Sequence, residues 1–65
     1  MTTQNAQHTY QVAFAREDGR WDVVETFEAR GNAAAERYAE RYCRRNHPDR
    51  VDDWYVLRDG KNIND

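Results

Sequence analysis

The fold is decided by residues 9–28, TYQVAFAREDGRWDVVETFE, which predict two strands joined by a turn. In Thr9–Ala15, large apolar residues alternate with small or polar ones, and this period of two is typical of a strand. Trp21–Glu28 is rich in Trp, Val, Thr and Phe and predicts the return strand. Between the two, Asp18-Gly19 favours a hairpin turn, because glycine accepts the positive φ that such turns require.

The stretch after the hairpin predicts a helix. Arg30-Gly31-Asn32 interrupts the strand pattern and Asn32 is a suitable N-cap, so we expect the helix to run from about Ala33 to Arg45 or Asn46. His47-Pro48 should end it, since the residue before a proline disfavours the α region. One apolar stripe recurs at helical spacing and is expected to face the sheet: Ala35, Tyr38, Ala39, Tyr42 and Cys43.

The last part of the chain predicts a third strand. Asp52–Arg58 contains strand formers and is followed by an Asp59-Gly60 turn, while Lys61–Asp65 is either a short fourth strand or a tail. The helix would carry the chain across one face, so that strand three enters beside strand one. We therefore expect an α+β fold, ββαβ, with one helix on a three-stranded antiparallel sheet of order 2-1-3. Residues 9–65 would form this single domain after a flexible tail at 1–8.

Length and composition narrow the function classes. At 65 residues the chain is short for a substrate cleft, and it carries no catalytic or cofactor motif, so we expect a non-enzymatic protein without cofactor. Its 12% aromatic residues indicate a folded core. The single cysteine excludes an internal disulfide. We find no signal peptide and no apolar run of about 18 residues, and therefore expect a soluble, cytoplasmic protein.

Cys43 and His47 are the only pair with a catalytic spacing. They are four residues apart, which could place a thiol beside a base on one helix face. However, Cys43 lies on the apolar stripe and no third, orienting residue is identifiable, so packing is the favoured role. We expect no metal site, because the histidines show no paired ligand spacing and the EF-hand pattern is absent from the acidic residues Asp49, Asp52 and Asp53.

Charge is unevenly distributed along the chain. Residues 30–50 hold six arginines and three carboxylates, a net charge of +3, whereas the rest holds four cations and nine carboxylates, a net charge of −5. The basic part coincides with the predicted helix, where basic residues form a ridge that could contact phosphates. Nucleic-acid binding, with Tyr or Trp side chains stacking on bases, is therefore our alternative function, through Arg37, Arg41, Arg44 and Arg45.

The sheet face away from the helix indicates a protein partner. Strand three turns outward one of two sets: Trp54, Val56 and Arg58, or Tyr55, Leu57 and Asp59. Strand two likewise turns outward one of two sets: Asp22, Val24 and Thr26, or Trp21, Val23 and Glu25. Exposed apolar area rimmed by charge is typical of an interface. We expect a monomeric inhibitor or adaptor, not bound to membranes, that meets a basic, nucleic-acid-binding protein through Glu17, Asp18, Asp22, Glu25, Asp52, Asp53, Trp54 and Asp59.

Several features of the whole chain occur together: the strand Tyr10–Phe14, the Asp18-Gly19 hairpin, an alanine-rich helix, and Trp54–Leu57 before Asp59-Gly60. In this general build the chain resembles small proteins of bacteriophages and other mobile elements, among them anti-CRISPR inhibitors. The resemblance implies a phage-encoded protein that binds a host effector in the bacterial cytoplasm. It further implies carboxylates presented where DNA phosphates would lie, and it transfers no individual functional residue.

Overall fold

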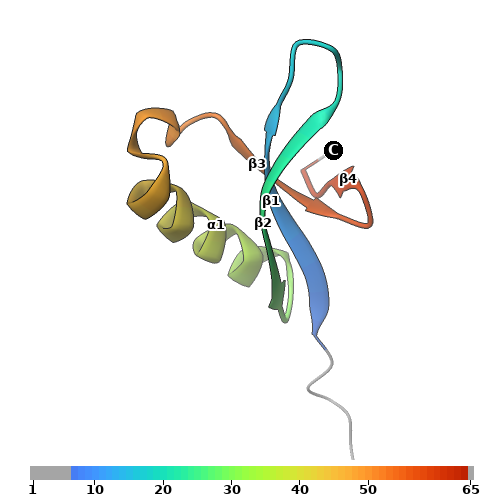
Figure 1. The fold of residues 1–65 in the computed structure, drawn as a ribbon. Helices are drawn as coiled ribbons and strands as arrows, with labels where there is room; N and C mark the ends of the chain where they lie inside the picture. Colours follow the sequence, from blue (N-terminus) through green and yellow to red (C-terminus); the bar gives the residue numbers. More distant parts are fainter. Residues whose placement is uncertain (1–6, 65) are drawn as a thin grey trace, which may run out of the picture.

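A computed structural model describes residues 7–64 of the protein. The elements are β1 (His8–Ala15), β2 (Trp21–Ala29), α1 (Asn32–Asn46), a 3-10 turn η1 (Pro48–Arg50), β3 (Trp54–Arg58) and β4 (Lys61–Asn62). The strands form one antiparallel sheet in the order β2-β1-β3-β4, and α1 lies against one face of it (Figure 1). This confirms the α+β prediction, with β1 central and a short fourth strand after β3. The tail expected at residues 1–8 lies outside the described residues except for its last two, and β1 already begins at His8.

The β1–β2 and β3–β4 turns each contain an Asp-Gly pair whose glycine has a positive φ. Gly19 has a φ of 85°, and the hairpin is closed by a backbone hydrogen bond from Arg16 to the carbonyl of Arg20. Between β3 and β4, Asp59 and Gly60 have φ values of 56° and 78°. Two consecutive positive φ angles define the two-residue turn whose twist matches antiparallel strands. Asp59-Gly60 therefore forms such a two-residue turn, whereas in the longer β1–β2 turn only Gly19 has a positive φ.

The helix begins one residue earlier than predicted, and Asn32 is not its N-cap. Gly31 occupies the cap position without a side-chain bond, and its carbonyl accepts the first helical hydrogen bond, from Ala35 at 3.0 Å. The Asn32 side chain instead accepts a hydrogen bond from the Tyr10 hydroxyl at 3.0 Å. The prediction was wrong because the amide is used for a tertiary contact that ties α1 to β1. At the other end, α1 stops at Asn46 before His47-Pro48, as predicted.

The third strand also differs from its predicted bounds, since it begins at Trp54 and not at Asp52. The chain first makes the turn η1, and the backbone N–H of Asp53 donates to the carbonyl of Arg50 at 3.2 Å. This local bond holds Asp52 and Asp53 in a bend before the sheet begins. The guanidinium of Arg50 also lies 3.8 Å from the centre of the Phe14 ring and closes that end of the core.

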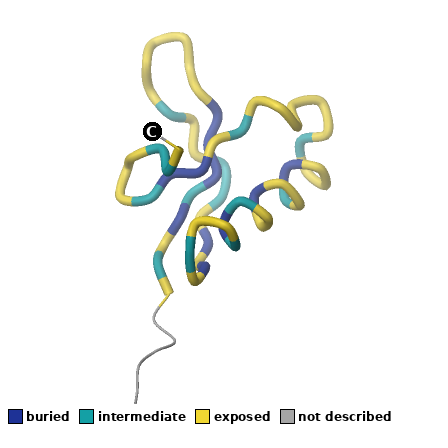
Figure 2. The backbone as a smooth tube through the Cα atoms, turned by 180° about the vertical axis from the view of Figure 1, so that it is seen from behind, coloured by how far each residue is buried: buried dark blue, intermediate teal, exposed yellow. Residues whose placement is uncertain are grey.

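The core lies between α1 and the sheet. Buried positions follow β1, β3 and the inner side of α1 (Figure 2). Small residues on α1 let the helix approach the strands closely. The core cluster is Tyr10, Val12, Phe14, Phe27, Ala29, Ala35, Ala39, Cys43 and Val56. Of the predicted stripe, Tyr38 is the exception, because 40% of it remains exposed at the margin of the core.

A β-bulge decides which side chains of β2 face the helix. Val12 pairs with Glu25 but Ala13 pairs with Val23, so Val24 is an extra residue. The alternation therefore shifts by one at Val24. Of the two outward sets predicted for strand two, the set with Trp21 and Val23 is right for these two residues but wrong for Glu25, because it assumed an unbroken period of two. The face away from α1 carries Trp21, Val23, Thr26 and Glu28 of β2.

Candidate partner-binding surfaces

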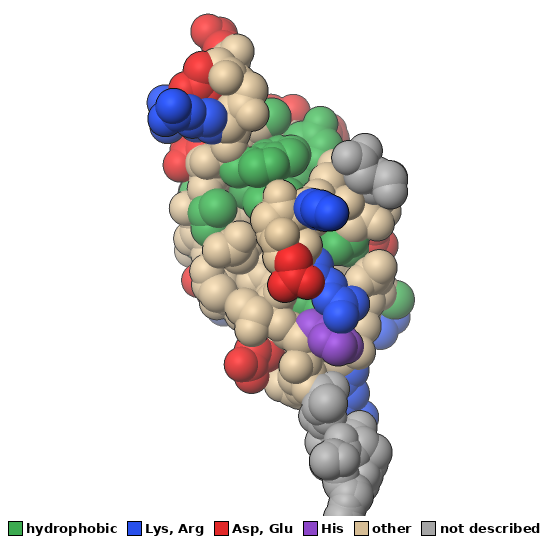
Figure 3. Space-filling model, turned by 90° about the vertical axis from the view of Figure 1, so that its right-hand side faces the viewer, with side chains coloured by type: hydrophobic (Ala, Val, Ile, Leu, Met, Phe, Trp, Pro, Cys, Tyr) green, Lys and Arg blue, Asp and Glu red, His purple; other side chains and the backbone are tan. Residues whose placement is uncertain are grey.

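The sheet face away from α1, here called the open face, carries an apolar patch. Ala13 pairs with Val23 on one side and with Tyr55 on the other, so these three side chains form one row across the sheet. Val23 is 42% and Tyr55 39% exposed. Within residues 7–64, neither α1 nor η1 covers this face, and apolar side chains gather there below the hairpin (Figure 3). We call Ala13, Trp21, Val23, Tyr55 and Leu57 the open-face patch.

Two aromatic rings of the open-face patch meet across β1. Trp21 belongs to β2 and Tyr55 to β3, yet their ring centroids lie 5.2 Å apart at an angle of 59°. The β1 positions between them are Ala13 and Ala15, whose short side chains leave room for the rings to approach. Ala13 is fully buried although it lies on the open face. The aromatic pair is thus a defined surface feature, built by small residues on the central strand.

Five of the predicted carboxylates lie at one end of the sheet, here called the hairpin end. Glu17 and Asp18 are in the β1–β2 turn, Asp22 follows at the start of β2, and Asp52 and Asp53 precede β3. Because Phe14 pairs with both Asp22 and Trp54, these segments approach the same end of the sheet. Residues 16–22 and 49–53 together hold six carboxylates and three arginines, a net charge of −3.

Arginines offset part of this charge. Arg16 lies 3.4 Å from Asp18, and Arg50 lies 3.8 Å from Asp53. In the part of the chain that the structure describes, Glu17, Asp22 and Asp52 take part in no ion pair. These three carboxylates are exposed, although Asp22 pairs with Phe14 and therefore points to the helix side of the sheet, as Glu25 does.

The other three predicted partner residues lie elsewhere. Glu25 faces the helix side and accepts a hydrogen bond from the Tyr38 hydroxyl at 2.7 Å. Asp59 is in the β3–β4 turn, at the opposite end of β3 from the hairpin end. Trp54 packs against the core cluster, and its neighbour Tyr55 takes the outward position instead.

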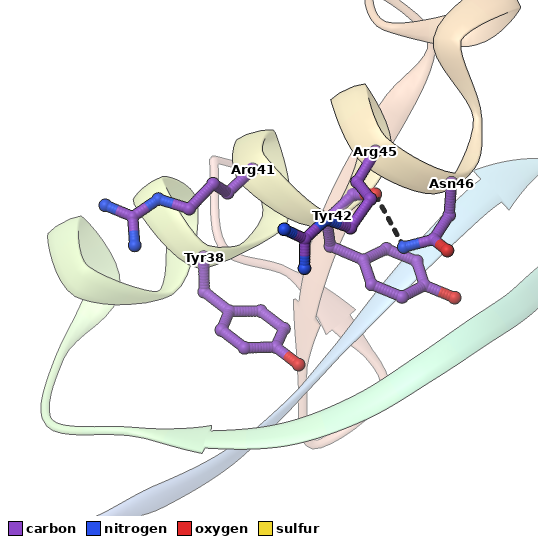
Figure 4. Close-up of a pocket in the computed structure, with 5 residues that line it drawn as sticks. All are labelled: Tyr38, Arg41, Tyr42, Arg45 and Asn46. Carbon is purple, nitrogen blue, oxygen red and sulfur yellow. Dashed lines mark hydrogen bonds between the residues drawn. The ribbon is translucent and has the colours of Figure 1, made fainter.

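The predicted arginine ridge borders a groove along α1, here called the tyrosine–arginine groove. Its volume is about 390 Å³, and it is lined by Tyr38, Arg41, Tyr42, Arg45 and Asn46 (Figure 4). The Tyr38 and Tyr42 rings are nearly parallel, at 9°, with centroids 6.4 Å apart. Arg37 and Arg44 lie outside this groove, beside Glu40, which pairs with Arg44 at 2.9 Å.

The tyrosines of the groove are anchored from the sheet. Phe27 stacks on Tyr38 with centroids 4.1 Å apart, and the Tyr42 hydroxyl donates to the backbone carbonyl of Val24 at 3.1 Å. The hydrogen bond to Glu25, and then burial, raise the pKa of Tyr38 above its ordinary value. A carboxylate accepting from the phenol favours the neutral form of the tyrosine, so this contact holds the ring in place at neutral pH.

Cys43 is fully buried in the core cluster, and burial raises the pKa of its thiol. An activated thiol requires the opposite shift. The His47 ring packs against Phe14 and Tyr42, with centroid distances of 5.2 and 5.7 Å. Across residues 7–64, no three His, Cys, Asp or Glu side chains are grouped so that they could hold a metal ion. No helix of that segment has the length and apolarity to cross a membrane.

Comparisons with protein-family models, with curated proteins and with solved structures found no match for this chain. The function of the protein is therefore inferred from its two surfaces. Sequence reasoning missed the open-face patch as a unit, because the bulge at Val24 and the orientation of β3 decide its membership. It also placed Tyr38 and Tyr42 in the core, although their helical spacing next to Arg41 and Arg45 was a usable signal of a shared surface.

Proposed function

We propose that the protein is a non-enzymatic protein-binding domain that docks on a basic protein surface. The open-face patch would provide the apolar contact, and the carboxylates of the hairpin end would meet cations of the partner. The observation that carries this proposal is the Trp21–Tyr55 pair beside exposed Val23, on a sheet face that α1 leaves uncovered. Tryptophan and tyrosine are enriched among the residues that contribute most to binding energy at interfaces.

The rigidity of the patch supports this role. Ala13 and Leu57 are no more than 1% exposed and give the patch a packed floor, while Val23 and Tyr55 project from strands paired to β1. Side chains that are ordered before binding lose less conformational entropy on association. A partner would therefore meet a surface that is already formed, and a strand-borne position is better defined than one on a loop.

The carboxylates of the hairpin end suggest the chemistry of the partner. Glu17, Asp22 and Asp52 are exposed and free of ion pairs among the described residues, so they would attract a cationic surface during approach. Proteins that bind nucleic acids carry such surfaces. We infer an inhibitor or adaptor of a nucleic-acid-binding host protein, of the anti-CRISPR kind that the chain's build resembles. It would act as a monomer in the bacterial cytoplasm.

The test is a matched pair of substitutions on the open face. Val23 and Thr26 are both exposed on β2 and point to the same side, but only Val23 belongs to the open-face patch. The tagged wild-type protein would capture its partner from the native host, and titration with that purified partner would follow. We expect Val23→Arg to weaken binding at least about tenfold, a loss of about 1.4 kcal/mol, and Thr26→Arg to change it little. Equal binding by the wild-type protein and Val23→Arg would refute the proposal.

A further inference from the structure

The tyrosine–arginine groove lies on the helix side of the sheet and takes no part in the binding proposed above. It combines two aromatic rings with two guanidinium groups, from residues spaced along one side of α1 (Figure 4). We propose that this groove binds single-stranded nucleic acid, with a base stacked on Tyr38 and neighbouring phosphates held by Arg41 and Arg45. Aromatic platforms beside cationic side chains are the general means by which proteins bind unpaired strands.

Tyr38 is built as a platform. Phe27 covers one face of its ring at a centroid distance of 4.1 Å and an angle of 18°. Its hydroxyl is fixed by the 2.7 Å hydrogen bond to Glu25, yet 40% of the residue remains exposed. Phe27 covers only one face of the ring, so we place the base on the part of Tyr38 that remains exposed. A base arriving there would stack on a ring whose position is already set, which reduces the entropy lost on binding.

Arg41 and Arg45 carry charge that is not paired with a carboxylate among the described residues. Both are exposed, and neither makes an ion pair or a side-chain hydrogen bond within the described chain. Arg44, by contrast, is paired with Glu40 at 2.9 Å. Positions four apart on a helix are displaced by about 6 Å along its axis and lie on the same side. The two guanidiniums can therefore reach successive anionic groups along an extended chain.

The combination favours a single strand over a duplex. Bases in a duplex are stacked on their neighbours, so their faces are closed to Tyr38, whereas an unpaired base offers its whole face. The groove of about 390 Å³ is lined by five residues of α1, of which only two are basic, so it is not a broad basic face. The chain as a whole has a net charge of −2, which also disfavours general adhesion to duplex DNA.

The experiment measures fluorescence polarisation of a labelled oligo-dT of about 12 nucleotides, within the length range that such sites cover. For single strands, the logarithm of affinity falls with the logarithm of salt by about 0.7 per neutralised phosphate. Two phosphates at Arg41 and Arg45 therefore predict about a sevenfold weaker affinity at about 200 mM than at about 50 mM salt. We expect Arg41→Glu with Arg45→Glu to reduce binding at least about tenfold and to flatten this salt dependence.

Two further variants separate stacking from charge. Tyr38→Leu keeps an apolar side chain against Phe27 but removes the aromatic face, and we expect a loss of roughly 5- to 150-fold. Arg16→Glu with Arg20→Glu makes the same charge change in the β1–β2 turn and should leave affinity within about threefold, since binding is assigned to the groove. Circular dichroism checks that each variant is folded.

Three results would overturn the inference. The first is no polarisation change with about 100 μM protein at low salt, where even weak nucleic-acid binding is measurable. The second is an equal loss of binding in the Arg16→Glu, Arg20→Glu control. The third is binding of a DNA duplex or of a poly-glutamate peptide as tight as that of oligo-dT, because either would mean that the groove recognises negative charge without stacking. The Val23→Arg variant should retain oligo-dT binding, so this test is independent of the open-face patch.

Discussion

Both faces of this sheet carry aromatic side chains, but α1 covers only one of the two faces. On the face covered by α1, Phe14 and Phe27 are buried in the core cluster. On the open face, Trp21 and Tyr55 contact each other but remain accessible. The covered face therefore stabilises the fold, whereas the open face has apolar area left for another molecule. In a chain of 65 residues, one helix is enough to cover only one of them.

The largest expected effect is on the covered face. Phe14 is 1% exposed and contacts both the His47 ring and the Arg50 guanidinium. Replacing a buried phenylalanine by alanine costs about 3–5 kcal/mol. A domain of this size has only about 3–10 kcal/mol of stability in total. We expect urea unfolding of Phe14→Ala to show a protein that is largely unfolded or close to it. A loss below about 1 kcal/mol would contradict the assignment of the core.

The next largest effect is on partner association. Glu17→Lys with Asp52→Lys reverses two exposed carboxylates of the hairpin end that make no ion pair in the described chain. We expect the association rate with the captured partner to fall about tenfold at low salt and less at high salt. Glu36→Lys with Glu40→Lys makes the same change in net charge on α1, away from both the hairpin end and the open face, and is the control. An equal fall in both variants would show that only net charge matters.

A smaller effect tests whether the open-face aromatic pair is a formed structure. Trp21 and Tyr55 have ring centroids 5.2 Å apart. Aromatic pairs contribute about 0.5–1.5 kcal/mol beyond the area that they bury. A double-mutant cycle with Trp21→Ala and Tyr55→Ala, followed by urea unfolding, should give a coupling energy in this range. Additive effects would mean that the rings do not interact in solution.

The smallest effect concerns Tyr38, whose pKa is raised chiefly by its hydrogen bond to Glu25. Because the pKa is higher in the folded state, this contact stabilises the fold below the ordinary tyrosine pKa of about 10, and the stabilisation is lost as pH rises through the folded value. Glu25→Gln should lower the pKa of Tyr38 toward the ordinary value, as followed by tyrosinate absorbance. An unchanged titration would remove Glu25 as the cause.

Much of the fold was predictable because local chemistry and tertiary structure agree. The period of two in Tyr10–Phe14, the Asp18-Gly19 turn and the helical spacing up to His47-Pro48 each led to the observed element. The order 2-1-3 followed from the helix carrying the chain across one face, so that strand three enters beside strand one. These features depend on residues close in sequence, and such signals are the most reliable ones.

The binding surfaces were less predictable because they depend on contacts between distant residues. The bulge at Val24 has no sequence signal of its own. Because of it, Val23 and Thr26 lie on the same face of the sheet, whereas an unbroken strand would place them on opposite faces. Asn32 had a favourable cap sequence but bonds to Tyr10, 22 residues away. Tyr38 remains partly exposed, with Phe27 stacked on one face of its ring. In each case a partner far away in sequence outweighed the local preference.

The most direct test of the account is a hydroxyl-radical footprint of the protein, free and bound to its captured partner. Side-chain oxidation reports solvent access residue by residue, so it reads both faces of the sheet in one experiment. We expect protection of Trp21, Val23 and Tyr55, with oxidation of Tyr38 unchanged, because only the open face is assigned to the partner. Protection of Tyr38 with Trp21 and Tyr55 as reactive as in the free protein would contradict the account.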